Sequence, residues 1–543
     1  MMQTDYDAII LGSGSTGLAA ALVAAKSGAR TLVIEKSELV GGTSAMSGAG
    51  TWIPANHHMT AAGIEDSAET ALDYMRATAP AGWREKEDDR WRALAENAAP
   101  MLAFLEANSP LRFDLAYHPD MYTEAPGGRE HGRMVSPRII SKNILPKRWR
   151  SRIRRSTMPI NATYQELIDG WKQGGSIREI LAFAPTVVWR MLRREVGQGN
   201  ALITGLLKGC LDAGAELVTR TRAVELVTEP ATGRVTGVVV EKDGKRTTLA
   251  AAKGVVIATG GFEWNEALRE KHFPGGGTLI ASPRTNTGDG QLMAQAVGAE
   301  LDHMEQANVF PVVPTLYEGK RHAFPLTEIY SPHCILVGPD GRRFANEGDP
   351  NIGIAVNQRD AATGGMKNLP AWKIFDRSHT RRNAMAMRMW KRDGEDLKTA
   401  PTIEALARLI DVDPAVLMAT VERFNRFVDQ GRDDDFHRGE TVWERYYTKD
   451  ARHPERNNSL GRIDTPPFYA TRYHHGIIVT KGGPRTSARG EVLRANGSRI
   501  GGLYAAGMAA ASPIGSKAIG AGTTIGPCLT SGYIAARALL GEN

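Results

Sequence analysis

Cysteine is scarce in this chain of 543 residues, which contains Cys210, Cys334 and Cys528 and no others. Their wide spacing offers neither the paired cysteines of a disulfide framework nor the closely spaced pairs of a metal knuckle. No apolar run approaches the roughly 20 residues that a membrane-spanning helix needs. An apolar segment already begins at residue 8, which leaves no room before it for a signal peptide. We therefore predict a cytoplasmic protein with no metal site and no membrane span.

Neither sign of charge dominates, because 67 lysines and arginines accompany 60 aspartates and glutamates, for a formal net charge of +7. A basic excess of this size fits nucleic acid, an anionic membrane surface or an ordinary solvated surface. The basic residues are densest between residues 142 and 155, where Trp149 is the one aromatic side chain. Nucleic-acid sites of the single-stranded kind interleave several aromatic side chains with basic ones. We therefore predict no nucleic-acid partner.

Apolar residues recur at a helical period from Ile177 to Leu192, and Arg178, Arg190 and Arg193 flank the apolar stripe. A basic amphipathic helix can lie on a membrane surface, or it can pack on the core with a solvated basic face. We favour packing on the core, because one helix of modest length binds lipid weakly. The sequence thus predicts at most a weak peripheral membrane contact.

The most informative stretch is residues 7–36, which reads as strand, glycine-rich turn, helix and strand. An apolar strand at 8–11 runs into a G-x-G-x-x-G, a helix follows at 18–26, and a second strand at 31–34 ends on Glu35. The glycines allow a tight turn and close approach to a pyrophosphate, the helix N-terminus attracts its charge, and the acid accepts hydrogen bonds from ribose hydroxyls. The predicted dinucleotide contacts here are Gly12, Gly14, Ser15, Thr16, Gly17, Glu35 and Lys36.

A second loop of small residues follows at 40–50 and decides which dinucleotide is expected. It resembles the flavin-contacting loop of the fumarate reductase and 3-ketosteroid dehydrogenase flavoprotein superfamily, which implies FAD. Some members bind FAD covalently through a histidine of this loop, but this loop contains none, so we expect non-covalent FAD. A second G-x-G-x-x-G for a nicotinamide is absent from the sequence, so the electron acceptor stays open. The contacts implied here are Gly42, Thr43, Ser44, Ser47, Gly48 and Gly50.

The resemblance continues along the chain in family order, through residues 254–261, 286–290, 335–347, 480–483 and 501–527. It implies an α/β fold, in which a Rossmann-like FAD-binding domain carries an inserted α+β cap domain for the substrate. The expected boundaries are 1–280 and 461–543 for the two parts of the FAD-binding domain, with a basic helical insertion at about 140–198, and 281–460 for the cap. Further implied FAD contacts are Ala223, Val224, Ala258, Thr259, Gly260, Asn286, Asp289, Gly507, Thr524 and Ile525.

Residues 44–54, 124–128 and 480–483 look most similar to the 3-ketosteroid dehydrogenases. This similarity implies an FAD-dependent dehydrogenase that introduces a C=C bond next to the carbonyl of a hydrophobic, steroid-like ketone. The alternative is the reverse chemistry, an ene-reductase acting on an unsaturated acid or ketone. A hypothesis from another class is a flavin-binding protein that acts through its basic segment, and it predicts salt-dependent binding without turnover.

Two departures from the family pattern concern catalysis. Ala518 stands where the ketosteroid 1-dehydrogenases carry a tyrosine in the C-terminal loop. Polar anchors that soluble fumarate reductases use for a dicarboxylate are replaced by Ala518, Val479 and Tyr330, so we reject succinate and fumarate as substrates. Each remaining candidate also has a purely structural interpretation, as a packed ring or a loop residue. The candidate catalytic residues are Tyr330, Tyr122, Lys517, Ser516 and His475.

Apolar residues at helical spacing predict helices at 68–77 and 90–107, the second of them interrupted by Pro100. Strands are predicted at 216–219, 235–241 and 254–257, and the last helix of the chain at 525–539.

Overall fold

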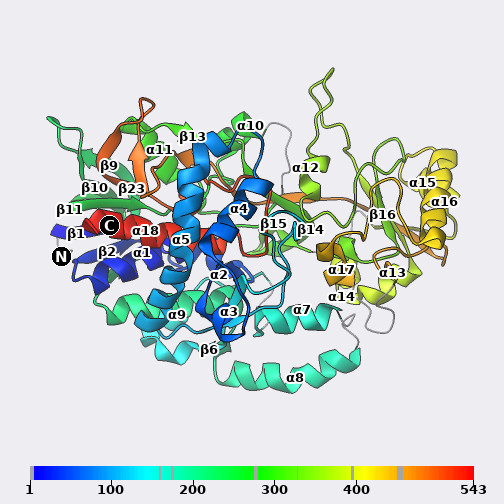
Figure 1. The fold of residues 1–543 in the computed structure, drawn as a ribbon, viewed down its shortest axis with the longest axis horizontal. Coiled ribbons are helices and arrows are strands. Elements are labelled where there is room, and N and C mark those ends of the chain that lie inside the picture. Colours follow the sequence, from blue (N-terminus) through cyan, green and yellow to red (C-terminus); the bar gives the residue numbers. More distant parts are fainter. Residues whose placement is uncertain are drawn as a thin grey trace.

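The structure of the protein is a computed structural model that describes residues 5–157, 161–172, 177–273, 279–326, 328–392, 397–448 and 456–542. Its elements form an α/β fold built on two groups of sheets (Figure 1). The α/β class predicted from the sequence is confirmed. Within the described residues, no helix is both long and apolar enough to cross a bilayer.

The first sheet contains the predicted nucleotide-binding unit at its centre. Strand β1 (Asp5–Leu11) lies parallel to β2 (Thr31–Ile34) on one side and to β11 (Lys245–Ile257) on the other. The apolar runs of these strands fit a position in which both faces are covered by other elements. The sheet is completed by β8 (Glu216–Val218), β22 (Glu491–Leu493) and β23 (Arg499–Ala505), with β9 (Arg222–Thr228) and β10 (Val235–Lys242) extending from β11.

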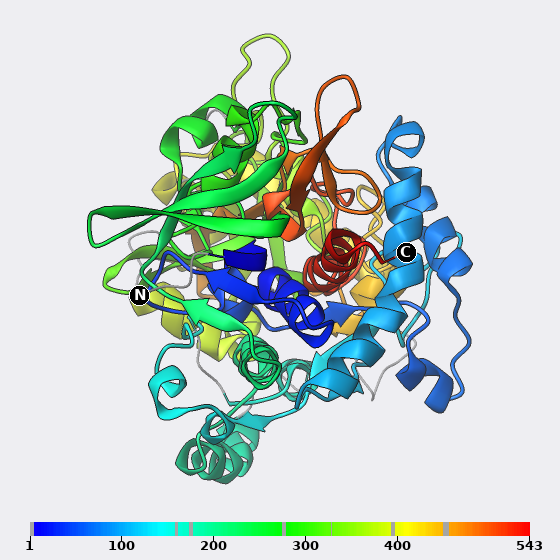
Figure 2. The same ribbon diagram turned by 90° about the vertical axis from the view of Figure 1, so that its left-hand side faces the viewer.

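Three helices cover one face of this sheet, as Figure 2 shows for α1 (Ser15–Lys26) and α18 (Ile525–Leu540). Helix α1 is buried from Ser15 to Ala25, and its many alanines let α18 and α9 (Gln198–Asp212) pack closely against it. Helix α18 therefore packs beside the glycine-rich turn and α1, so that segments from the two ends of the sequence lie together.

Helix α5 (Arg84–Asn108) runs without interruption through Pro100, so the predicted break there is wrong. Proline removes one backbone hydrogen bond and crowds the preceding turn. The helix tolerates this because Met101, Leu102 and Leu105 are fully buried immediately after it, in the core that contains α18. Helix α4 (Ala68–Thr78) packs beside α5.

The second group contains two sheets, which together with the helices packed on them are called the second part of the chain. One sheet has the order β12 (Leu279–Ile280), β20 (His475–Thr480), β14 (Ala307–Tyr317) and β15 (Lys320–Pro325). The other has the order β16 (Cys334–Val337), β17 (Trp372–Asp376), β19 (Phe468–Arg472) and β18 (Leu397–Ala400), with α15 (Ile403–Leu409) and α16 (Pro414–Gln430) packed against it. In Figure 1, β14 and β15 of one sheet lie near the middle of the molecule and β16 of the other lies toward the right.

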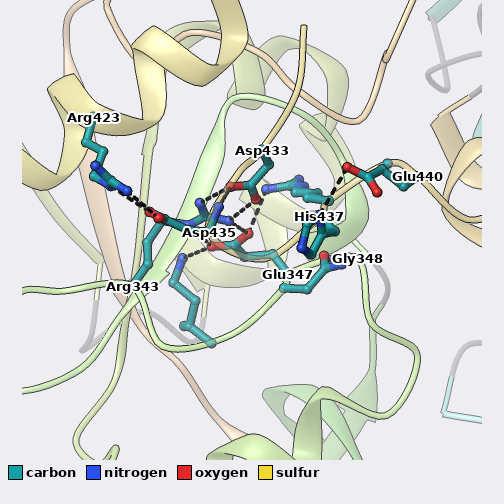
Figure 3. A network of polar contacts seen from close by, with 12 residues as sticks. Arg343, Glu347, Gly348, Arg423, Asp433, Asp435, His437 and Glu440 are labelled. Atoms are coloured by element: carbon teal, nitrogen blue, oxygen red, sulfur yellow. Dashed lines mark hydrogen bonds and ion pairs between the residues drawn. The ribbon is translucent and has the colours of Figure 1, made fainter. Parts of the chain in front are cut away.

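A buried network of charged groups closes this second part of the chain (Figure 3). The Arg343 guanidinium lies 2.8 Å from a carboxylate oxygen of Glu347 and 2.8 Å from one of Asp433, and Arg438 lies 3.2 Å from Glu347. Burial alone would raise the pKa of the Glu347 carboxyl, but attraction to Arg343 and Arg438 outweighs burial and holds that pKa below its usual range. The network joins the segment after β16 to the segment after α16.

Shorter elements connect these parts. The helices are α2 (Gly42–Met46), α3 (His57–Ala61), α6 (Lys147–Arg150), α7 (Tyr164–Lys172), α8 (Ile177–Leu192), α10 (Glu266–His272), α11 (Asp289–Ala296), α12 (Ile352–Val356), α13 (Arg377–Arg382), α14 (Ala384–Arg392) and α17 (Val442–Thr448), with 3-10 turns η1 (Lys142–Ile144), η2 (Glu328–Tyr330) and η3 (Gly507–Ala509). The strands are β3 (Thr51–Trp52), β4 (Phe113–Leu115), β5 (Met134–Pro137), β6 (Ile140–Ser141), β7 (Glu195–Val196), β13 (Leu301–Asp302) and β21 (Gly483–Pro484).

Candidate active site

A cavity of about 360 Å³ opens at the carboxyl ends of β1, β2 and β11. Its wall is formed by the G-x-G-x-x-G turn, the small-residue loop after β2, the start of α18 and residues of the second part of the chain. Open α/β sheets bind their ligands in a crevice of this kind, outside the carboxyl ends of the strands.

The glycines of the turn have different roles, because some are needed for close packing and one lines the cavity. A Cβ atom on Gly12 would lie 2.4 Å from the carbonyl oxygen of Ala258, and one on Gly17 would lie 2.0 Å from the Gly12 oxygen, so both positions need glycine for packing. Gly14 instead has no atom closer than Ser44 Oγ at 3.8 Å, and it lines the cavity. Gly14 is the N-cap residue of α1 and has no side chain to cap the helix, while the Ser15 N–H donates to Ser44 Oγ at 3.2 Å. The N-terminus of α1 lines the cavity and offers positive potential to an anionic group.

Glu35 lies on the cavity wall and is held firmly in place. Its carboxylate accepts hydrogen bonds from the Ser13 hydroxyl at 2.6 Å, from the Ser13 backbone N–H at 3.1 Å and from the Ser37 N–H at 2.8 Å. Three bonds leave acceptor capacity on the two oxygens for a ligand hydroxyl. The arrangement fits a carboxylate that orients a ribose.

Two cations line the same end of the cavity. The Lys36 ammonium donates to Thr287 Oγ1 at 2.7 Å and pairs with Asp289 at 3.0 Å. Arg154, which the sequence placed only in a basic cluster, is buried on the cavity wall and pairs with Glu318 at 2.8 Å. The Thr259 hydroxyl is buried on this wall and has no hydrogen-bond partner among the described residues. Cations, an unpartnered donor and an open helix N-terminus together fit a diphosphate-containing ligand.

Most residues predicted to contact the cofactor line this one cavity. The exceptions lie beside it: Gly17 packs against Gly12, Val224 follows Ala223 on β9, and a Cβ atom on Gly507 would lie 2.3 Å from Thr16 Oγ1. The residues on the wall are Gly12, Gly14, Ser15, Thr16, Glu35, Lys36, Gly42, Thr43, Ser44, Ser47, Gly48, Gly50, Ala223, Ala258, Thr259, Gly260, Asn286, Asp289, Thr524 and Ile525.

The far end of the cavity is aromatic and carries no charge among the described residues. Tyr330 comes from η2, Phe310 from β14, Tyr164 from α7, and Trp443 and Tyr447 from α17. The rings of Tyr330 and Tyr447 lie 5.4 Å apart between centroids. Apart from Tyr330, these residues were missed at the sequence level, because they are spread over α7, β14 and α17 and no local motif marks them. Met121 and Ala518 complete this end of the wall.

The hydroxyl of Tyr330 is buried and has no hydrogen-bond partner among the described residues. A buried polar group without a partner costs free energy, so this hydroxyl is a natural place for a ligand oxygen or proton. Burial raises the pKa of Tyr330 above its ordinary value, with nearby Asp349 as a smaller cause. The phenol is therefore neutral at neutral pH.

Two further phenols form a hydrogen-bonded chain beside Tyr330. The Tyr447 hydroxyl lies 3.0 Å from His118 Nε2, and it also bonds to Tyr164, whose pKa burial raises to about 12. His118 is buried among the rings of Trp443, Tyr446 and Tyr447. These hydrogen bonds place the imidazole of His118 behind the phenols of the cavity wall.

Tyr122 and Lys517 do not line the cavity: Lys517 precedes Ala518 in the same loop, and Tyr122 packs against this loop. The Tyr122 hydroxyl accepts a hydrogen bond from the Asn351 amide at 2.7 Å, and the Lys517 ammonium lies 4.2 Å from the centre of the Tyr122 ring. Asn351 also exchanges hydrogen bonds of 2.8 Å with both the backbone N–H and the carbonyl of Ala518. These contacts fix the loop against the second part of the chain.

Ser516 and His475 line a second cavity of about 360 Å³, which also includes Val309 and Ile477. Val309 and Ile477 belong to β14 and β20, and other residues of these two strands, Asn308, Phe310, Ile478 and Val479, line the first cavity. Ser516 Oγ accepts from the Ala307 N–H at 3.0 Å. Burial, with His474 as a smaller cause, lowers the pKa of His475 to about 4, so this imidazole is neutral.

Comparison with known proteins agrees with this geometry. The FAD binding domain family matches residues 7–525. The chain is 34% identical to 3-oxosteroid 1-dehydrogenase of Mycobacterium tuberculosis (strain ATCC 25618 / H37Rv), over 99% of this chain and 98% of that protein. It is 36% identical to 4-oxocyclohexanecarboxylate 2-dehydrogenase of Sinomonas cyclohexanicum, over 99% of this chain and 94% of that protein.

Its fold resembles the crystal structure of 3-ketosteroid delta1-dehydrogenase from Sterolibacterium denitrificans in complex with 1,4-androstadiene-3,17-dione. The TM-score is 0.90 at 32% identity, and the match covers 99% of this chain and 100% of that chain. The expected resemblance to the ketosteroid dehydrogenase branch and the expected FAD cofactor are both confirmed. The chain therefore belongs to the FAD binding domain family, as an FAD-dependent oxidoreductase related over its full length to the 3-oxosteroid 1-dehydrogenases.

Proposed function

We propose that this enzyme removes two hydrogens from adjacent carbons of a hydrophobic, steroid-like ketone and so introduces a C=C bond next to the carbonyl. The observation that carries this proposal is the uncharged, aromatic end of the cavity, which faces the nucleotide end across one continuous space. Flat apolar substrates pack well against aromatic rings.

The uncharged aromatic end also bears on which of two relatives, the 3-oxosteroid 1-dehydrogenase or the 4-oxocyclohexanecarboxylate 2-dehydrogenase, is the better guide to the substrate. A 4-oxocyclohexanecarboxylate carries an anionic group, and an anion transferred to an apolar pocket needs a cationic partner. The cations on the cavity wall, Lys36 and Arg154, belong to the end near Glu35, and none of the described residues that line the aromatic end is charged. The site therefore favours a neutral ketone over a keto acid.

Bound FAD supplies the hydride acceptor, and the residues of the chain handle the proton and the carbonyl. Tyr330 is proposed to take the proton from the carbon beside the carbonyl in its phenolate form, because its hydroxyl lies on the wall without another partner. The neutral phenol must first lose its own proton, so this role requires that bound FAD and substrate lower the raised pKa of Tyr330. The backbone at 520–524, just before α18, is proposed to receive the carbonyl oxygen, since N–H groups near a helix N-terminus stabilise developing negative charge. Tyr122 and Lys517 are proposed to support the loop, while Ser516 and His475 are no longer favoured for the chemistry.

The residues that the sequence assigned to the cofactor and that line the cavity are proposed as its contacts, with Arg154 added. Gly17, Val224 and Gly507 lie beside the cavity and are not included. We also propose that residues 281–460 act as the cap over the two FAD-binding parts, 1–280 and 461–543. A cytoplasmic location is proposed as well, because Cys210, Cys334 and Cys528 are all buried as free thiols.

The second candidate is an ene-reductase that adds hydrogen to an unsaturated ketone, since both directions use one site. Product analysis separates the two. With a saturated 3-ketosteroid and an artificial electron acceptor, the dehydrogenase forms a product two hydrogens lighter than the substrate. Conversion only of the unsaturated ketone, with a reduced dye as donor, would favour the ene-reductase.

Replacing Glu35 with glutamine should weaken FAD binding. A hydrogen bond from a ribose hydroxyl to a charged acceptor is worth about 1.5–3 kcal/mol, so the Kd for FAD is expected to rise about 10- to 150-fold. Glutamine keeps the shape of the side chain, so the thermal midpoint of the apoprotein serves as the control. An unchanged Kd in a titration of apoprotein with FAD would show that Glu35 does not hold the cofactor.

Acid precipitation of the holoenzyme should leave the yellow colour in the supernatant. The reason is that residues 41–50 contain no histidine for a covalent link to the flavin. The flavin absorbance of supernatant and pellet after precipitation measures the outcome. Flavin that stays with the precipitated polypeptide contradicts non-covalent binding.

We further propose a weak peripheral membrane contact through α8, which lies along the lower edge of the molecule in Figure 1. Four neighbouring apolar side chains are exposed there, namely Val188, Trp189, Met191 and Leu192, with exposed fractions between 55% and 75%. Arg193 lies beside them with 58% of its side chain exposed, although it pairs with Glu195 at 2.8 Å. Arg190 is largely buried in a pair with Glu166, so the proposed contact rests on the apolar side chains.

Serine at both Trp189 and Leu192 should reduce co-sedimentation with vesicles that contain anionic lipid, by about tenfold in partition coefficient. Leu316→Ser is the matched control, because Leu316 is equally exposed but lies on β14. Equal sedimentation of the double variant, the control and the wild type would argue against a membrane role for α8.

A further inference from the structure

Lys481 is a buried cation without an anionic partner. It follows β20 directly, is 1% exposed, and its ammonium donates to the carbonyl oxygens of Ile514 at 3.2 Å and Gly515 at 2.7 Å. No carboxylate of a described residue lies within ion-pair distance of it. By contrast, Lys373 on β17, which is also buried, pairs with Glu328 at 2.8 Å.

Buried charges are normally paired, because transfer of an isolated ion out of water is costly. Two neutral carbonyl groups accept from two of the three N–H donors of the Lys481 ammonium, but they do not neutralise its charge. A compensating negative charge must therefore come from elsewhere, or the charged state is maintained at a cost in free energy.

The position of Lys481 relative to the cavity identifies where such a charge can arise. Val479, two residues earlier on β20, lines the FAD cavity, and so does Cys528 in the first turn of α18. Cys528 is the titratable group that interacts with Lys481, and burial raises the pKa of its thiol, so the thiol remains neutral. Lys481 thus lies behind residues of the cavity wall and near the N-terminus of α18, where the helix dipole is also positive.

We propose that Lys481 is an electrostatic residue whose counter-charge is the reduced flavin ring, and that it raises the reduction potential of the bound FAD. The proposal rests on the proposed dehydrogenase function. In that reaction the substrate loses a hydride and a proton: the two electrons of the hydride enter the flavin, which gains one negative charge, and the proton goes to the base. A fixed cation behind the ring stabilises the state that carries this charge.

We also expect Lys481 to change how the reduction potential of the bound FAD depends on pH. Burial lowers the pKa of Lys481 to about 8, so the ammonium is charged at neutral pH and titrates within the stable range of most proteins. A negative flavin raises the pKa of a neighbouring ammonium. Just above pH 8, reduction therefore carries an additional proton onto Lys481, and the potential falls more steeply with pH than it does below pH 8.

The test measures the midpoint potential of the bound FAD by spectroelectrochemistry, with mediator dyes and no steroid. Two variants separate charge from hydrogen bonding: Lys481→Met removes both, whereas Lys481→Gln keeps an amide donor for the two carbonyls. The affinity ratio of reduced to oxidised FAD is expected to fall about tenfold in both variants, equivalent to about 30 mV. Oxidised FAD should bind the variants with nearly the wild-type Kd.

The proposal is overturned if both variants retain the wild-type potential, or if only Lys481→Met lowers it, because hydrogen bonds to the loop would then explain the effect. Should neither variant fold, the wild type alone decides, since a potential with an unchanged slope through pH 8 contradicts the proposal. No steroid is present in these measurements, so a wrong substrate assignment leaves their outcome unaffected.

Discussion

Phenylalanine in place of Tyr330 is expected to leave FAD bound and to slow flavin reduction by about 10²- to 10⁴-fold, the usual range for a lost acid–base group. The C-terminal loop has Ala518 at its tyrosine position, so the phenol of Tyr330 has no replacement there. The measurement is anaerobic single-turnover reduction by a ketosteroid, followed at the visible flavin band.

Tyr122→Phe is the matched control for this experiment. It removes a hydroxyl that bonds to Asn351 behind the loop, so its effect should stay close to the value of one hydrogen bond, about 0.5–1.5 kcal/mol. If Tyr330→Phe reduces the flavin at the wild-type rate, the proton is taken elsewhere. The phenol chain of Tyr164 and Tyr447, backed by His118, is then the next candidate.

Replacement of Arg343 with methionine should destabilise the second part of the chain by about 3–5 kcal/mol, because it leaves Glu347 and Asp433 as buried charges with one partner fewer. Urea unfolding measures the loss. Arg423→Met is the control, since the Arg423–Asp435 pair of the same region is exposed and should matter little (Figure 3). Equal stability of the two variants would show that the buried network does not hold this region together.

The same network predicts the direction of acid sensitivity. Burial alone would raise the pKa values of Glu347 and Asp433, but the bonds and attraction to Arg343 outweigh it and lower both below their usual values. A carboxyl with a lowered pKa stabilises the fold above its unfolded-state pKa of about 4, and this contribution is lost as the pH falls below that value. Arg343→Met should therefore show a weaker loss of stability between pH 5 and pH 3 than the wild type.

The FAD end of the site was predictable because its information is local. Gly12, Gly14 and Glu35 lie within one strand–turn–helix–strand unit, and the fixed geometry of that unit converts sequence spacing into spatial position. Gly17 and Gly507 were assigned to the cofactor but lie in close packing beside the cavity, since a glycine required for packing and one required for ligand access look alike in a sequence.

The substrate end was not predictable in the same way. Tyr164, Phe310, Trp443 and Tyr447 come from three separate elements, and only the folded chain brings them together. The sequence favoured Tyr330 only slightly over Tyr122, because a sequence does not show whether a side chain points into a cavity or lies behind a loop. The predicted interruption of a helix at Pro100 was wrong for a similar reason, because burial of the residues after Pro100 outweighs the local tendency of proline to interrupt a helix.

The most direct test of the central claim is anaerobic addition of a neutral 3-ketosteroid to the oxidised holoenzyme, with 4-oxocyclohexanecarboxylate added to a second sample. An uncharged aromatic cavity end beside FAD predicts that the steroid bleaches the visible flavin absorbance in a single turnover, while the keto acid bleaches it far more slowly. Rapid bleaching by the keto acid with none by the steroid would contradict the account.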